Sequence, residues 1–168
     1  MLISKKWLNS HLDLTDLSNN EFDDILTFAG VEVEGITEKG VASDLVVVAE
    51  VVASEQHPNA DRLSVTKVDA GEPELRQIVC GAKNYKVGDK VPCALPGAVL
   101  PGGFEIKETV MRKVESRGML CSAVEVGLGS DHSGLMILPA EWETGKPLRQ
   151  FVDDDTIFET EVTPNRPD

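Results

Sequence analysis

The sequence predicts a mainly β fold, in which a small five-stranded barrel is inserted into a discontinuous α/β flanking module. Short apolar runs of strand length, separated by turn residues, follow one another from residue 45 onward. Residues 1–39 instead combine helix signals with one alternating segment. Acidic side chains gather in the flanks, with 3 basic and 8 acidic residues in 1–39, 12 and 15 in 40–150, and 1 and 6 in 151–168. We therefore expect the first part of the module at 1–39, the barrel at 40–150 and the start of the second part at 151–168.

Two short helices are predicted in the first segment. Ser18 followed by Glu21 forms a capping box, and apolar residues then recur at helical spacing until Gly30 provides a C-terminal stop. A shorter helix is expected over residues 5–11, with Ser4 as its N-cap.

Two flanking segments have the alternating pattern of half-exposed strands. Residues 31–38 alternate apolar and acidic side chains, and residues 156–162 repeat this alternation. Because the ends of a host module must lie close together where another domain is inserted, we expect these two strands to pair.

The barrel strands are predicted from apolar runs bounded by turn residues, and we expect a five-stranded antiparallel barrel over residues 45–110. A barrel of this size is of the oligonucleotide-binding type, the OB-fold. The segment 121–129 is predicted as a short helix after the barrel. The runs are residues 45–54, 63–71, 75–81, 90–95 and 105–114, with a later run at 134–139.

The stretch "HPNADR" at residues 57–62 is predicted to be the loop between the first two long strands. Pro58 has no backbone donor and restricts His57 to an extended conformation, while Asn59 and Asp61 suit turn positions. A catalytic role for His57 and Asp61 has little support, because no nucleophile elbow such as G-x-S-x-G is present.

The composition bounds the remaining classes of function. A hydrophobic content of 41% and a charged content of 27% are typical of a globular protein. No window approaches 18 uninterrupted apolar residues, so we expect a cytoplasmic protein without a membrane segment. Cys80, Cys93 and Cys121 have neither disulfide nor zinc spacing, and we expect buried reduced thiols and no metal site.

One cluster of cations is the candidate nucleic-acid interface, although the formal charge of −13 argues against a simple nucleic-acid binder. Clustered cations on one barrel edge could follow a phosphate backbone, and a neighbouring serine could bond a phosphate or a backbone group. Interleaved glutamates favour the alternative of a solvated strand face. The candidate residues are Lys107, Arg112, Lys113, Ser116 and Arg117, and the glutamates are Glu105, Glu108 and Glu115.

Several stretches resemble a known family. Residues 57–71 ("HPNADRLSVTKVDAG"), 78–84 ("IVCGAKN"), 91–103 ("VPCALPGAVLPGG") and 115–127 ("ESRGMLCSAVEVG") resemble, in order and spacing, the tRNA-binding OB-fold module of several aminoacyl-tRNA synthetases. The flanks, with "WLNSHLDL", "FAGVEVEG" and "EVTPNRPD", resemble the start of the bacterial phenylalanyl-tRNA synthetase beta subunit.

The resemblance implies a noncatalytic N-terminal fragment of an enzyme that attaches phenylalanine to its tRNA. The implied partners are the tRNA for phenylalanine and the alpha subunit, in a two-alpha, two-beta assembly. ATP and magnesium are implied for the full enzyme, with no active site and no cofactor in this fragment. Two alternatives stay open: a free-standing tRNA-binding or chaperone-like OB-fold homodimer, and a structural scaffold module that contacts no RNA.

Overall fold

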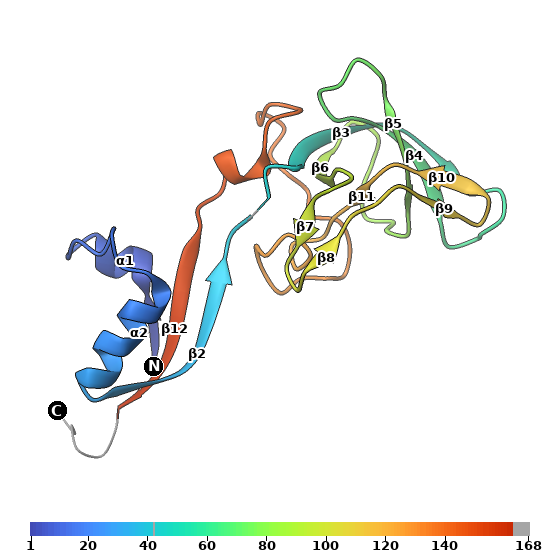
Figure 1. The fold of residues 1–168 in the computed structure, drawn as a ribbon. Helices are drawn as coiled ribbons and strands as arrows, with labels where there is room; N and C mark the ends of the chain where they lie inside the picture. Colours follow the sequence, from blue (N-terminus) through green and yellow to red (C-terminus); the bar gives the residue numbers. More distant parts are fainter. Residues whose placement is uncertain (42, 163–168) are drawn as a thin grey trace. The chain divides into compact units, whose positions relative to one another are not determined.

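The computed structural model describes residues 1–41 and 43–162, which form two compact units (Figure 1). Unit 1 contains residues 1–39 together with the chain from residue 154 onward, and unit 2 contains residues 40–153. Unit 2 is therefore inserted into unit 1 along the sequence. Residues 163–168 of the "EVTPNRPD" segment that carried part of the resemblance lie outside the described residues.

Unit 1 is built on a three-stranded antiparallel sheet of order β1-β12-β2. Its strands are β1 (Leu2–Ser4), β2 (Val31–Lys39) and β12 (Asp155–Val162), with β12 in the centre. The predicted pairing of residues 31–38 with 156–162 is confirmed: the register runs from Val162 opposite Val31 to Thr156 opposite Glu38, with one irregularity after Glu159.

Two helices in unit 1 begin at the predicted caps. The Ser4 side chain accepts a hydrogen bond from the Trp7 backbone N–H at the start of α1 (Lys5–Asn9), which ends two residues earlier than predicted. Ser18 and Glu21 form the complete capping box of α2 (Asn19–Phe28).

A small apolar core joins α2 to the sheet of unit 1. The rings of Phe22 on α2 and Phe158 on β12 meet edge to face, with centroids 4.8 Å apart. Leu14 completes the set of buried side chains in this cluster. Burial of the alternate positions of β12 explains the alternating pattern of the sequence.

Unit 2 contains a five-stranded antiparallel sheet of order β11-β6-β3-β4-β5, curved into a nearly closed barrel. The segment before β11 approaches β5, where the Arg117 backbone N–H donates to the Gln77 carbonyl at 2.8 Å. The fold is thus mainly β with an OB-fold-like barrel, as predicted. The strands are β3 (Val46–Gln56), β4 (Ser64–Asp69), β5 (Arg76–Cys80), β6 (Lys90–Ala94) and β11 (Met119–Leu120).

The fifth barrel strand differs from the prediction. The run 105–114 does not form it, because the chain reverses at Arg112 and Lys113, which both have positive φ. This run instead contributes to two small hairpins, and the fifth strand is β11, beyond residue 110. The hairpins are β7 (Val99–Leu100) with β8 (Phe104–Glu105), and β9 (Thr109–Met111) with β10 (Val114–Ser116).

Two other predicted elements are also less regular. Residues 134–139 contain only one isolated bridge, from Leu138 to Lys90, and residues 121–129 form turns instead of a helix. A short 3-10 helix, η1 (Leu148–Gln150), precedes the return to unit 1.

The first half of strand β3, residues 46–51, is buried on both faces, which explains the nearly continuous apolar sequence there. Val46 and Val48 pack in one hydrophobic cluster, whereas Val47 and Val51 pack in the other. The three cysteines are free and buried, which confirms the prediction of reduced thiols.

Candidate nucleic-acid interface

The loop at residues 57–62 connects β3 and β4, as predicted, and is closed by its own hydrogen bonds. The His57 backbone N–H donates to the Leu63 carbonyl at 3.0 Å. The Gln56 side-chain amide donates to the carbonyls of Ala60, Asp61 and Leu63 at 2.9 to 3.1 Å. These bonds give the loop a defined shape at the end of a long strand.

Two side chains of this loop contact the tip of the β9–β10 hairpin. His57 is only 3% exposed, and its Nδ1 accepts a hydrogen bond from the Asn59 backbone N–H at 2.9 Å. Since Nδ1 accepts, the ring proton lies on Nε2, which donates to the Met111 carbonyl at 3.0 Å. The Asn59 side-chain amide donates to the Arg112 carbonyl at 3.1 Å. The loop therefore holds two consecutive carbonyls of the hairpin.

The hairpin tip presents two free cations. Arg112 and Lys113 form the two-residue connection between Met111 and Val114, with φ values of 49° and 71°. Such a turn normally has Asn and Gly, because positive φ is unfavourable for other residues. Both side chains are exposed, and within the described chain neither charged group has a hydrogen-bond or ion-pair partner.

A further cation belongs to the same region and was missed by the sequence reasoning. Arg62 lies in the loop that is bonded to the hairpin tip, is exposed, and has no polar side-chain partner among the described residues. Its position 50 residues from Arg112 in the sequence explains why no local charge pattern indicated it.

The structure separates the other predicted site residues from this tip. Lys107 is exposed in the segment before the hairpin. Ser116 is 2% exposed; its Oγ accepts from the Val79 backbone N–H at 3.1 Å and donates to the Gly118 carbonyl at 3.2 Å. The hydroxyl of Ser116 therefore bonds backbone groups of the barrel, which is one of the two roles that the sequence left open.

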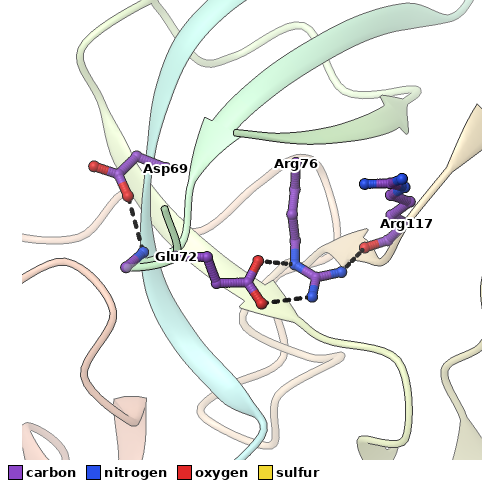
Figure 2. A network of polar contacts seen from close by, with 5 residues as sticks. Asp69, Glu72, Arg76 and Arg117 are labelled. Atoms are coloured by element: carbon purple, nitrogen blue, oxygen red, sulfur yellow. Dashed lines mark hydrogen bonds and ion pairs between the residues drawn. The ribbon is translucent and has the colours of Figure 1, made fainter. Parts of the chain in front are cut away.

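Arg117 lies at the base of the hairpin beside acidic groups. Figure 2 shows Arg76 between Glu72 and Arg117: its guanidinium bonds both Glu72 carboxylate oxygens, at 2.6 and 2.7 Å, and donates to the Arg117 carbonyl at 2.9 Å. The hydrogen bond from Arg76 lowers the pKa of Glu72. The Arg117 side chain is 44% exposed and approaches Glu115 at 4.0 Å.

A hollow of about 420 Å³ beside Arg117 is lined by more carboxylates than cations. Glu72, Glu74 and Glu108 face it together with Arg76 and Arg117. Arg117 is four residues beyond Lys113, or roughly 13 Å at the rise of a strand. The predicted cluster is therefore divided. The hairpin tip carries only cations, whereas the other end of the hairpin, near Arg117, carries both cations and carboxylates.

Other kinds of site have less support in the described residues. Residues 1–41 and 43–162 contain no group of three or more His, Cys, Asp or Glu side chains placed to hold a metal ion. None of the helices in this part of the chain has the length and apolar character needed to cross a membrane.

Comparison with known proteins identifies relatives of both units. Residues 46–147 match the family model described as "Putative tRNA binding domain". The phenylalanine–tRNA ligase beta subunit of Chromobacterium violaceum is 53% identical over 169 residues, which cover 100% of this chain and 21% of that protein. The beta subunit from Neisseria meningitidis is 52% identical over 170 residues, covering 100% of this chain and 22% of that protein. The chain thus spans about a fifth of the length of these curated relatives.

Among solved structures, the C-terminal domain of Plasmodium vivax p43 is 26% identical, with a TM-score of 0.44, over 60% of this chain and 56% of that chain. The sequence matches to the ligase beta subunits extend through both flanks as well as the barrel. With a family model that covers most of unit 2, this chain belongs to the tRNA-binding domain family.

Proposed function

We propose that this chain is the noncatalytic N-terminal part of a phenylalanine–tRNA ligase beta subunit, and that its barrel contacts the backbone of the tRNA. The observation that carries this proposal is the hairpin tip, where Arg112 and Lys113 are exposed and unpaired within the described chain. Arg62 lies in the loop bonded to this tip. We call these three residues the basic rim.

Electrostatics supports a small contact of this kind. Lys and Arg side chains at phosphates supply most of the non-specific affinity for nucleic acids. The formal charge of −13 opposes binding, but charges farther away than about 8 Å are largely screened at physiological salt. A few unpaired cations at a protruding tip can therefore dominate the local potential.

The five residues predicted from the sequence are not equal candidates in this proposal. Arg112 and Lys113 are primary, and Lys107 is a peripheral contact, because it is exposed and precedes the hairpin. Ser116 is a weaker candidate since its hydroxyl already bonds two backbone groups. Arg117 is also weaker because carboxylates surround it.

The proposed context is a cytoplasmic two-alpha, two-beta ligase that charges the tRNA for phenylalanine with the use of ATP and magnesium. The described residues do not fit a magnesium site, because they contain no suitable cluster of acidic ligands. We therefore assign no chemical step to this chain. Its contribution is to bind or orient the tRNA.

A fluorescence anisotropy titration with the tRNA for phenylalanine tests the proposal. The chain should bind with a Kd of roughly 10⁻⁴ to 10⁻⁶ M, the ordinary non-specific range. Arg112→Ala/Lys113→Ala should weaken binding and reduce the salt slope by about 0.7 to 0.9 for each lost phosphate contact. Lys86→Ala/Lys146→Ala is the matched control, because it removes two exposed cations from unit 2 outside the rim.

The outcomes separate the alternatives. An equal loss in both double variants would reject the basic rim and indicate a response to net charge alone. Unchanged affinity in Arg112→Ala/Lys113→Ala would reject the hairpin tip as the contact. Absence of any binding would favour the scaffold hypothesis, and nanomolar affinity would refute the electrostatic argument.

A further inference from the structure

We propose that His57 is a positioning residue for RNA binding: its neutral imidazole fixes the hairpin tip and so holds Arg112 and Lys113 in one orientation. This inference rests on the proposed function of the basic rim. It assigns a role to the buried histidine of the β3–β4 loop, which lies 54 residues before the carbonyl that it contacts.

The hairpin needs support from outside because it is short. Strands β9 and β10 have three residues each, and all three residues of β9 are exposed. Two-stranded hairpins are marginally stable by themselves in water. The connection is also unfavourable, since Arg112 and Lys113 both have positive φ.

The hairpin is anchored at both of its ends. At its base, the Gln77 side-chain amide donates to the Glu115 carbonyl at 2.9 Å, and Ser116 bonds the backbone of β5. At its tip, the His57 ring donates to the Met111 carbonyl, and the Asn59 side-chain amide donates to the carbonyl of the next residue, Arg112. The loop contact is therefore what restrains the tip.

The imidazole can make its two bonds in one state only. Nδ1 must be unprotonated to accept from the Asn59 N–H, and Nε2 must be protonated to donate to the Met111 carbonyl. A proton on Nδ1 would face the Asn59 N–H and remove that bond. The contact thus specifies the neutral Nε2–H tautomer.

A restrained tip favours binding without adding charge. When a flexible tip binds a phosphate, ordering of the tip reduces the net affinity, whereas a tip that is already ordered avoids this cost. Loss of the His57 contact should therefore lower affinity and leave the salt slope unchanged. Removal of the cations lowers both quantities.

Two substitutions at position 57 test the two hydrogen bonds of the His57 ring separately. Gln has a side-chain nitrogen near the position of Nε2, so His57→Gln can keep the bond to Met111. Asn reaches only the position of Nδ1, so His57→Asn can keep the bond to the Asn59 N–H and loses the link to the hairpin. Asn59→Ala removes the second link without altering a buried residue.

The first measurement uses the full chain without RNA. Amide hydrogen exchange at Met111 and Val114, the pair of residues that closes the hairpin, should accelerate about tenfold or more in His57→Asn and remain near the native rate in His57→Gln. The ring ¹⁵N shifts of the native protein should report a protonated Nε2 and an unprotonated Nδ1. A protonated Nδ1, or unchanged exchange in both His57→Asn and Asn59→Ala, would overturn the positioning role.

The second measurement is tRNA affinity by anisotropy. We expect His57→Asn to weaken binding about fivefold to tenfold at constant salt slope, with His57→Gln within twofold of the native chain. Native affinity in His57→Asn, while Arg112→Ala/Lys113→Ala weakens binding, would overturn this inference and leave the proposed function standing. If the cation variant also binds normally, the proposed function fails, and the positioning role for RNA fails with it.

Discussion

Replacement of the hairpin tip by Asn-Gly should stabilise the protein and weaken its binding to RNA. Arg112 and Lys113 have φ values of 49° and 71°, in the left-handed region. This conformation costs roughly 1–2 kcal/mol for an ordinary L-residue and little for Asn or Gly. Gly also increases the entropy of the unfolded chain, which offsets about 0.4–1 kcal/mol of the gain.

The two positions together relieve about 2–4 kcal/mol, so the net change in the free energy of unfolding for Arg112→Asn/Lys113→Gly is an increase of about 1–3.5 kcal/mol. For a domain of slightly more than 100 residues, at about 4 °C per kcal/mol, that corresponds to a rise in Tm of roughly 4–14 °C. The bonds from His57 and Asn59 are retained, because they end on backbone carbonyls. Thermal unfolding by circular dichroism and urea unfolding should both detect the increase.

The matched control is Arg112→Lys/Lys113→Arg, which keeps both charges and both left-handed positions. Its Tm and its tRNA affinity should stay near the native values. A Tm that falls or stays constant in the Asn-Gly variant would refute the strain argument. If the Asn-Gly variant were more stable and bound tRNA normally, the strained conformation would exist without a role for the two cations.

Two further predictions concern the packing of unit 2. Gly71→Ala should lower the free energy of unfolding by at least about 3 kcal/mol, because the added Cβ would lie 2.5 Å from the Gly145 Cα at a position with a φ of +81°. The control is Gly88→Ala, at a φ of +97°, where an added Cβ would contact no other atom. It should lower the free energy of unfolding by only about 1–2 kcal/mol. Equal urea midpoints for these variants would contradict the close approach. Burial raises the pKa of Cys93 from 9.0 to about 12, so its contribution to stability is complete below pH 9 and is lost as the pH rises toward 12. Between pH 9 and 12 the free energy of unfolding should therefore fall more steeply in the native chain than in Cys93→Ala, by up to about 1.4 kcal/mol per pH unit. Parallel plots of the free energy of unfolding against pH for the two proteins would contradict this prediction.

Several helices, strands and turns could be predicted from residues that are close together in the sequence. The caps at Ser4 and Ser18 act within one helical turn, and the apolar runs of β3 to β6 are bounded by turn residues next to them in the sequence. The turn at residues 57–62 follows from Pro58 and its neighbours. These elements could be predicted because the residues that determine them are adjacent in the sequence.

Elements that depend on distant contacts could not be placed in the same way. The β9–β10 turn contains Arg-Lys where a hairpin of this kind normally has Asn-Gly, so the sequence predicted one continuous strand. Residues 121–129 begin like a helix, since Ser122 and Glu125 exchange cap-like hydrogen bonds. The turn ends at Gly127, which has a φ of +79° and lies against the Gly40 carbonyl.

The candidate site was predicted only in part, because it also depends on contacts between residues that are distant in the sequence. Clustering of Lys107, Arg112, Lys113 and Arg117 was visible in the sequence, but their neighbours in the fold were not. Tertiary contacts place Arg117 among carboxylates and bring the loop that contains Arg62 to the hairpin tip. The bond from His57 to Met111 spans 54 residues, and no local pattern indicates it.

A weak rim is compatible with a useful role if the proposed larger assembly provides a second tRNA contact. Glu115 lies two residues after Lys113, so the basic surface is short and can neutralise only a few phosphates. A site with a Kd of roughly 10⁻⁴ to 10⁻⁶ M is largely empty at low concentrations of free RNA. For an RNA that is already held elsewhere, the effective concentration reaches the millimolar range, which is sufficient to occupy such a site. The basic rim would then determine how a bound tRNA is oriented, while most of the affinity comes from the other contact.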